Sequence, residues 1–147
     1  MILDKDFKEF IELLIKHKVK YLIVGGFAVG VHGHPRYTGD IDIWLDVSEN
    51  NGEKMMIVLR EFGFTSLGLS KEDFLKPDRV IQLGYNPYRI DLLTGISGVK
   101  FVDAYKNKVQ IELSGLLLDF IGYDELVKNK KVSGRSRDLD DIDNLKE

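Results

Sequence analysis

Three aspartates interrupt apolar stretches of the sequence, where a carboxylate is unusual. Asp40 and Asp42 flank Ile41 at the start of an apolar run, and Asp91 lies inside the run 89–93. In an extended segment, residues two apart point to the same face, so Asp40 and Asp42 present neighbouring carboxylates. Their mutual repulsion and their apolar neighbours make this pair costly. A divalent cation held between the two carboxylates would offset that cost.

Mg²⁺ suits this pattern because it keeps several waters and takes one or two carboxylates plus substrate phosphates. If the segment 89–93 pairs beside the segment 41–47, Asp91 joins the other carboxylates, and two ions can then bridge them for an in-line phosphoryl displacement. Two structural alternatives remain open. Asp40 follows a glycine and suits a solvent-facing turn, and Asp91 can simply pair with Arg89 on the same face of its strand.

A glycine pair precedes the aspartates. Gly25 and Gly26 follow the β-prone run 21–24 and lead into a helix predicted over 27–32. Glycines let a ligand approach the backbone closely, and N–H groups at a helix N-terminus favour anions, so the pair suits phosphate binding. An ordinary tight turn is the alternative. The pair belongs to neither a dinucleotide-binding fingerprint nor a Walker A loop.

Several cations and histidines extend this hypothesis. Arg36 can contact phosphate just before the aspartates and Thr38 can hydrogen-bond locally, unless they are an exposed arginine and a turn-forming threonine. Arg137 can return to the same cleft and contact phosphate, unless it begins a solvated helix. His32 and His34 have no cysteine or third ligand nearby, so we expect them to pack at a helix end rather than bind zinc.

Composition limits the class of protein. The 147 residues suit one domain, and the net charge of −3 provides no global basic field for nucleic acid. Cysteine is absent, which removes disulfides and thiol catalysis. No apolar stretch approaches the roughly 20 residues that span a bilayer, and the first residues do not resemble a signal peptide. We expect a cytoplasmic protein without a membrane partner.

Hydrophobic periodicity predicts the elements that position these residues. Helices are expected over 4–17, 27–32, 48–62, 124–131 and 136–145, and strands over 21–24, 41–47, 80–85, 89–93, 99–105, 109–113 and 116–121. Asp4 and Ser48 are the expected N-caps, and Ile15 is placed on the inner face of the first helix. The order indicates an α/β (α+β) domain over 1–147, with a mixed central sheet flanked by helices and a helical segment 124–147 packed on it.

The residues "VGGFAVGVHGHPRYTGDIDIWLD" (24–46) and "RIDLL" (89–93) together resemble the nucleotidyltransferase superfamily with the DNA polymerase β-type palm fold. Its pattern is an apolar strand, a Gly-Gly or Gly-Ser pair, an acidic-apolar-acidic segment and a later acidic residue between apolar ones. The residue pattern over 25–42 and the C-terminal segment "GRSRDLDDIDNL" resemble the corresponding segments of a small stand-alone branch that includes the AbiEii-like proteins.

The resemblance implies transfer of a nucleoside monophosphate from an NTP to a hydroxyl acceptor. Gly25 and Gly26 would hold the triphosphate, Asp40 and Asp42 would bind Mg²⁺ or Mn²⁺, and Asp91 would help to bind a second ion and activate the acceptor. The acceptor (small molecule, RNA or protein) stays open, as does a homodimer or a small helical partner. A non-catalytic nucleotide-binding or toxin–antitoxin-type module on the same fold is the main alternative. A DxD-type glycosyltransferase fits poorly, because the chain is short for that fold.

Overall fold

A six-stranded mixed sheet forms the centre of the computed structural model, which describes residues 3–33, 39–64, 67–85 and 88–145. The strand order is β3-β4-β2-β1-β6-β5. The strands are β1 (Tyr21–Val24), β2 (Asp40–Leu45), β3 (Val80–Tyr85), β4 (Tyr88–Leu93), β5 (Val109–Leu113) and β6 (Leu116–Phe120). The predicted fold class, a mixed sheet flanked by helices, is confirmed.

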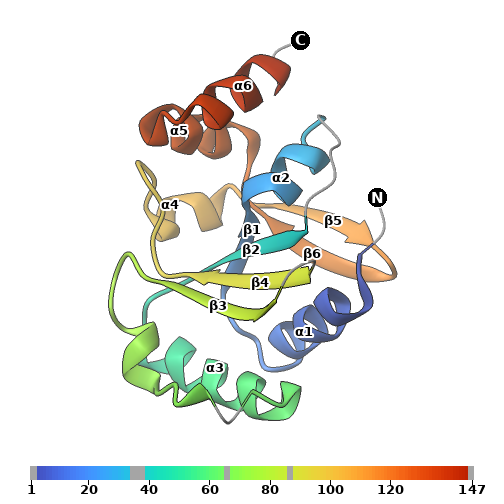
Figure 1. Cartoon of the computed structure of the whole chain (residues 1–147), viewed down its shortest axis with the longest axis vertical. Helices are drawn as coiled ribbons and strands as arrows, with labels where there is room; N and C mark the ends of the chain where they lie inside the picture. Colours follow the sequence, from blue (N-terminus) through green and yellow to red (C-terminus); the bar gives the residue numbers. More distant parts are fainter. Residues whose placement is uncertain (1–2, 34–38, 65–66, 86–87, 146–147) are drawn as a thin grey trace.

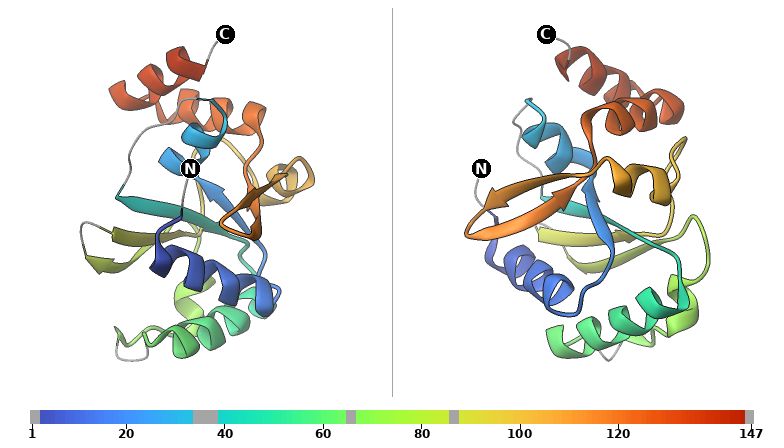
Figure 2. Two further views of the ribbon diagram at one scale, coloured as in Figure 1. Left: turned by 90° about the vertical axis from the view of Figure 1, so that its right-hand side faces the viewer. Right: turned by 180° about the vertical axis from the view of Figure 1, so that it is seen from behind.

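Helices cover the sheet on opposite sides (Figure 1). They are α1 (Lys5–Lys16), α2 (Gly25–Val31), α3 (Glu49–Phe62), α4 (Phe101–Lys106), α5 (Tyr123–Ser133) and α6 (Ser136–Leu145), with a short 3₁₀ helix η2 (Lys71–Phe74). In Figure 1, α1 and α3 lie below the strands, and α2, α5 and α6 lie above them; Figure 2 shows the same separation from two further sides. Among the helices in the described ranges, none has the length and apolar character needed to cross a membrane.

Two helix starts follow directly from local sequence. The side chain of Asp4 accepts a hydrogen bond from the Asp6 N–H at 3.0 Å, and that of Ser48 accepts one from the Asn51 N–H at 3.1 Å. Both N-caps match the expectation, because a short oxygen-bearing side chain satisfies an N–H group that the first turn leaves free. Ile15 was placed on the inner face of α1, but it is 41% exposed and lies at the margin of that face.

The segment 99–105 was predicted as a strand, which is wrong, because residues 101–105 lie in α4 and Val99 forms only an isolated bridge with Ile96. Phe101 and Tyr105 are four residues apart and stack with ring centroids 5.4 Å apart, and Phe101 also packs edge-on against Trp44 at 5.1 Å. Ala104 lies fully buried on the same face. The spacing 101, 104, 105 is helical, but a run this short is too ambiguous to read by periodicity alone.

The register of β2 decides which polar side chains meet. β2 pairs antiparallel with β1, so that Val24 lies opposite Asp42, and parallel with β4. On the β4 side, Asp42 lies opposite Asp91 and Asp40 lies opposite Arg89. Because side chains alternate between the two faces of a sheet, all four charged residues project from the same face. The helix α2 begins at Gly25, directly after β1 and two residues earlier than predicted.

Candidate active site

Three carboxylates converge on this face of the sheet. Asp40, Asp42 and Asp91 each offer one oxygen atom, and these atoms lie within 4.8 Å of one another. From the sequence, Asp91 was expected to join the other two only if the segment 89–93 paired beside β2. The structure shows this pairing. We call Asp40, Asp42 and Asp91 the carboxylate cluster.

Burial makes Asp42 costly to ionise. Desolvation, together with the negative charges of Asp40 and Asp91, raises the pKa of Asp42 to about 7, while Lys130 acts in the opposite direction. Asp91 is only 5% exposed. A divalent cation would remove both the repulsion and the desolvation cost, and three carboxylate oxygens are the ligands that Mg²⁺ and Mn²⁺ prefer. The donor set therefore fits such an ion.

Arg89 binds directly to the carboxylate cluster. Its Nε donates to Asp91 Oδ1 at 2.7 Å, and its Nη2 donates to Asp91 Oδ2 at 2.9 Å and to Asp40 Oδ2 at 3.3 Å. The sequence suggested pairing between Arg89 and Asp91 as an alternative to a functional role for Asp91. The structure shows that the two are compatible, because Asp91 pairs with Arg89 and still lies within the carboxylate cluster.

Gly25 gives Asp42 the space that its carboxylate occupies. Its φ of +68° lies in the left-handed region, and a Cβ atom added there would overlap Asp42 Oδ2 and lie 2.9 Å from Asp42 Cγ. A side chain at Gly25 is thus excluded both by backbone conformation and by contact. The glycine pair forms the first turn of α2, beside the carboxylate cluster, rather than a loop that precedes the helix. Gly26 is the second residue of this turn and is half-buried.

A cleft of about 440 Å³ lies over the carboxylate cluster, and α5, the start of α6 and the turn between them supply cations to its lining. Lys130, Arg135 and Arg137 line it together with the carboxylate cluster and Arg89. The structure therefore brings Arg137 to the same cleft as the aspartates. Arg36 and Thr38 lie outside the described residues.

A second set of charges joins α5 to α6. Lys130 Nζ lies 3.1 Å from Asp138 Oδ1 and 3.0 Å from Asp141 Oδ2, and Arg135 Nε lies 2.8 Å from Asp138 Oδ2. Burial raises the pKa of Asp138, but hydrogen bonds from Arg135, Ser133 and Lys130 outweigh it and hold this pKa well below its usual range. We call Lys130, Arg135, Asp138 and Asp141 the helix ion network.

Sequence reasoning did not single out Lys130, nor the contact between Arg89 and Asp40. Lys130 and Asp138 lie on different helices, separated by a turn at Gly134 with φ +65°, so no helical period connects them. Arg89 did carry a signal, since it lies two residues from Asp91 on the same face of a strand.

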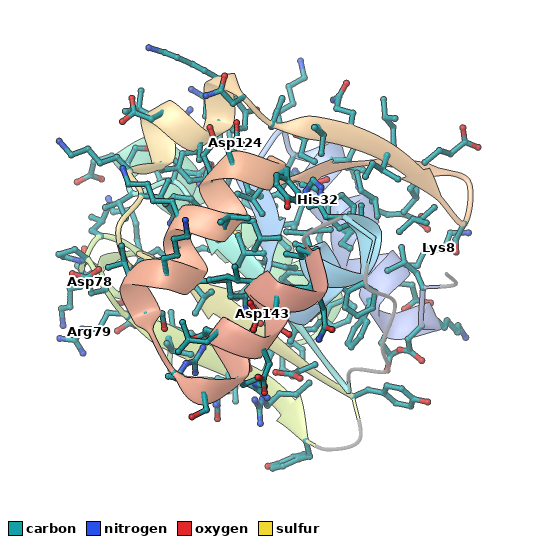
Figure 3. The ribbon with its side chains drawn as sticks, turned by 90° about the horizontal axis from the view of Figure 1, so that it is seen from above. Lys8, His32, Asp78, Arg79, Asp124 and Asp143 are labelled. Carbon is teal, nitrogen blue, oxygen red and sulfur yellow. The ribbon has the colours of Figure 1, made fainter. Side chains whose placement is uncertain are left out.

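His32 has the packing role that the sequence indicated. Its Nε2 lies 2.7 Å from the Ile121 carbonyl oxygen, and its ring meets the Tyr123 ring edge-on with centroids 5.9 Å apart. Figure 3 shows His32 near the start of α5, where Asp124 is labelled. The contact ties the end of α2 to the beginning of α5. His34 lies outside the described residues.

Comparison with solved structures identifies the fold that carries this site. No protein-family model matches the sequence, and no curated protein matches it. The lincosamide antibiotic adenylyltransferase LnuA, in its lincomycin-bound structure, is 16% identical with a TM-score of 0.57, over 98% of this chain and 96% of that one. A candidate nucleotidyltransferase from Thermotoga maritima is 17% identical with a TM-score of 0.61, over 93% of this chain and 88% of that one. The AbiEii-like branch stays a prediction. The chain has the fold of these nucleotidyltransferase structures.

Proposed function

We propose that this protein is a nucleotidyltransferase that depends on Mg²⁺ or Mn²⁺ and moves a nucleoside monophosphate from an NTP to a hydroxyl acceptor. The observation that carries the proposal is the convergence of Asp40, Asp42 and Asp91 beside the first turn of α2. Three carboxylates held this closely against buried surface are unfavourable for a purely structural purpose. They suit a site that binds a divalent cation together with phosphates.

Each predicted residue has a place in this proposal. The carboxylate cluster binds the cation, and the N–H groups of Gly25 and Gly26 hold the triphosphate at the start of α2. Arg137 contacts phosphate from the opposite wall of the cleft. For Arg36 and Thr38, which lie outside the described residues, the proposal is the one the sequence suggests: Arg36 contacts phosphate and Thr38 hydrogen-bonds locally.

The transfer forms one bond and breaks one. The acceptor oxygen bonds to the α-phosphorus of the NTP, the bond from that phosphorus to the pyrophosphate oxygen breaks, and the hydroxyl proton is lost to water. A bound divalent cation supplies charge neutralisation and Lewis acidity at the phosphates. The chain itself orients the triphosphate and excludes water from the cleft floor, where Asp91 is buried.

A small-molecule acceptor is the first class to test. Almost the whole length of the lincomycin-bound adenylyltransferase corresponds to this chain, which supports the idea that a chain of this length can take a small acceptor. RNA and protein acceptors belong in the same screen. The screen combines α-labelled NTPs with Mg²⁺ or Mn²⁺ and follows transfer of the label.

Calorimetric titration tests the binding step before any acceptor is known. Each NTP is titrated into the protein with Mg²⁺ and with Mn²⁺, and we expect binding that requires the ion and is lost in Asp42→Asn. Asp46→Asn is the matched control, because Asp46 follows the same strand but lies outside the carboxylate cluster. Absence of binding with every NTP and both ions would refute the proposal, as would full binding by Asp42→Asn.

A further inference from the structure

Arg89 occupies a position that the proposed reaction leaves without a role. It projects from β4 on the same face as Asp91 and lies opposite Asp40 across the β2–β4 pair. Its guanidinium forms a two-pronged bond with Asp91, at 2.7 Å and 2.9 Å, and reaches Asp40 at 3.3 Å. Nη2 of Arg89 therefore bridges Asp91 and Asp40, two members of the carboxylate cluster.

This arrangement places a permanent positive charge against Asp91. An arginine side chain does not lose its proton in proteins, and its planar fork matches a carboxylate with two parallel hydrogen bonds. The side chain of Asp91 is 7% exposed and that of Arg89 is 27% exposed, so water screens the pair only in part. Each carboxylate oxygen has two lone pairs, so Asp91 can accept from Arg89 and still offer an oxygen to one cation.

We propose that Arg89 takes the place of a second divalent ion, so that the site holds a single ion with Arg89 as a positioning residue. This inference rests on the proposed function and narrows it. A second dication beside Asp91 would lie against the guanidinium, and like charges repel strongly where solvent is partly excluded. It would also have to displace the two-pronged bond. A single ion that takes one oxygen from Asp91 leaves the two-pronged bond in place and brings only half as much ionic charge near the guanidinium.

The same contacts give Arg89 its positioning role. Asp91 is joined at both oxygens and Asp40 at one, so the guanidinium limits the rotation of both carboxylates around the cation position. The arginine also lines the cleft, where its charge faces the place proposed for the triphosphate. The two-ion arrangement that the family resemblance implies is therefore replaced by one ion and one guanidinium.

Electron paramagnetic resonance with Mn²⁺ tests this inference on the whole chain. The protein is saturated with a non-hydrolysable α,β-methylene ATP analogue and Mn²⁺, and bound ions are counted per chain. Two Mn²⁺ ions bridged at about 3.5–4 Å give a spin-coupled spectrum, whereas one isolated ion gives six lines. We expect one ion and six lines for the wild type.

Substitutions at Arg89 identify what excludes the second ion. Arg89→Gln removes the charge and is expected to raise the count from one ion to two, with a coupled spectrum. Arg89→Lys keeps the charge and is expected to keep one ion, bound less tightly because the fork is lost. Arg79→Gln, at an exposed arginine outside the cleft, is the control and is expected to match the wild type.

The outcomes separate the two proposals. A coupled pair in the wild type, or a single ion in both the wild type and Arg89→Gln, overturns the role of Arg89 and leaves the proposed function standing. No bound Mn²⁺ with the ATP analogue, together with no binding of any NTP in the calorimetric titrations, overturns both. If Arg89→Gln does not fold, the wild-type count and the Arg89→Lys count decide, and two ions in either one contradict the inference.

Discussion

Two charged groups meet at one cleft and have opposite electrostatic character: the carboxylate cluster lines it with its aspartates, and the helix ion network lines it with Lys130 and Arg135. In the helix ion network, Asp138 and Asp141 face the cations of Lys130 and Arg135, so two negative charges meet two positive ones. In the carboxylate cluster, Arg89 hydrogen-bonds to Asp91 and Asp40, and Asp42 lies among neighbouring negative charges. Cations of the chain hold Asp138 of the first group in its charged form. In the second group, burial and the neighbouring carboxylates oppose the charge of Asp42.

The pKa values express this difference. Burial favours the protonated acid in both groups, yet the pKa of Asp138 is held below its usual range while that of Asp42 rises to about 7. Hydrogen bonds from cations decide the first case, and desolvation with neighbouring carboxylates decides the second. Cations that the chain itself supplies to a buried aspartate stabilise the fold, whereas a strongly raised pKa in a cleft is typical of functional sites.

The largest expected effect is on the helix ion network. Asp138→Asn leaves the buried charge of Lys130 with one partner fewer, so we expect the free energy of unfolding to fall by about 3 kcal/mol or more. Urea denaturation at pH 7 measures it. A loss below about 1 kcal/mol would show that the helix ion network is not the structural element described here.

A pH series comes next, because the two groups respond to pH in different ranges. The folded pKa of Asp42, about 7, exceeds its ordinary value of 3.8, so the folded state binds this proton more tightly. The resulting stabilisation is complete below pH 4 and is lost as pH rises through 7. Between pH 5 and 8, without divalent ions, we expect Asp42 to lower the free energy of unfolding by roughly 3 kcal/mol.

The difference between the wild type and Asp42→Asn isolates this contribution from other titrating groups. Urea denaturation at pH 5 and pH 8 is measured for both, and Asp46→Asn serves as the control with an unchanged slope. Mg²⁺ at pH 8 is expected to restore stability to the wild type and not to Asp42→Asn. Equal slopes in the two proteins would show that Asp42 ionises normally.

Gly25→Ala tests whether space for Asp42 is what the glycine provides. The left-handed backbone costs about 1–2 kcal/mol for a residue with a Cβ, and here the Cβ also displaces the Asp42 carboxylate. We expect lower stability and at least about a tenfold loss of Mg²⁺-dependent NTP affinity, which corresponds to about 1.4 kcal/mol.

Gly63→Ala is the matched control for this substitution. Gly63 has φ +97°, and an added Cβ meets nothing within 4 Å, so only the backbone cost applies. Calorimetry should show unchanged NTP binding in Gly63→Ala. If both variants bind NTP equally well, the contact between Gly25 and Asp42 does not matter for binding.

The smallest expected effect on stability belongs to Asp40 of the carboxylate cluster. Asp40→Asn makes the same chemical change as Asp138→Asn, but the side chain of Asp40 is 36% exposed, so we expect less than about 1 kcal/mol of change in unfolding free energy. Asp40→Asn removes a negative charge from beside Asp42, so the pKa of Asp42 should fall. Carbon-13 NMR titration of the Asp42 carboxyl measures this pKa, and an unchanged value would contradict the electrostatic coupling.

Local patterns predicted the members of the carboxylate cluster and most of the elements that carry them. The two-residue spacing of Asp40 and Asp42 sets their shared face, and the helix caps at Asp4 and Ser48 follow from side-chain chemistry alone. The same reasoning failed over 99–105, where tertiary packing of Phe101 against Trp44 selects a helix. It also missed Lys130, whose partners lie on the next helix.

The sequence by itself determined which residues carry negative charge and where the glycine pair lies. It also determined that Asp40 and Asp42 share one face of a strand. The tertiary structure alone decided that β2 lies parallel to β4 in the register that places Asp42 opposite Asp91 and Asp40 opposite Arg89. It also decided that α5 and α6 return over the same cleft. Spacing along a strand is a local property of the backbone, whereas register and helix return depend on packing between segments that are far apart in the chain.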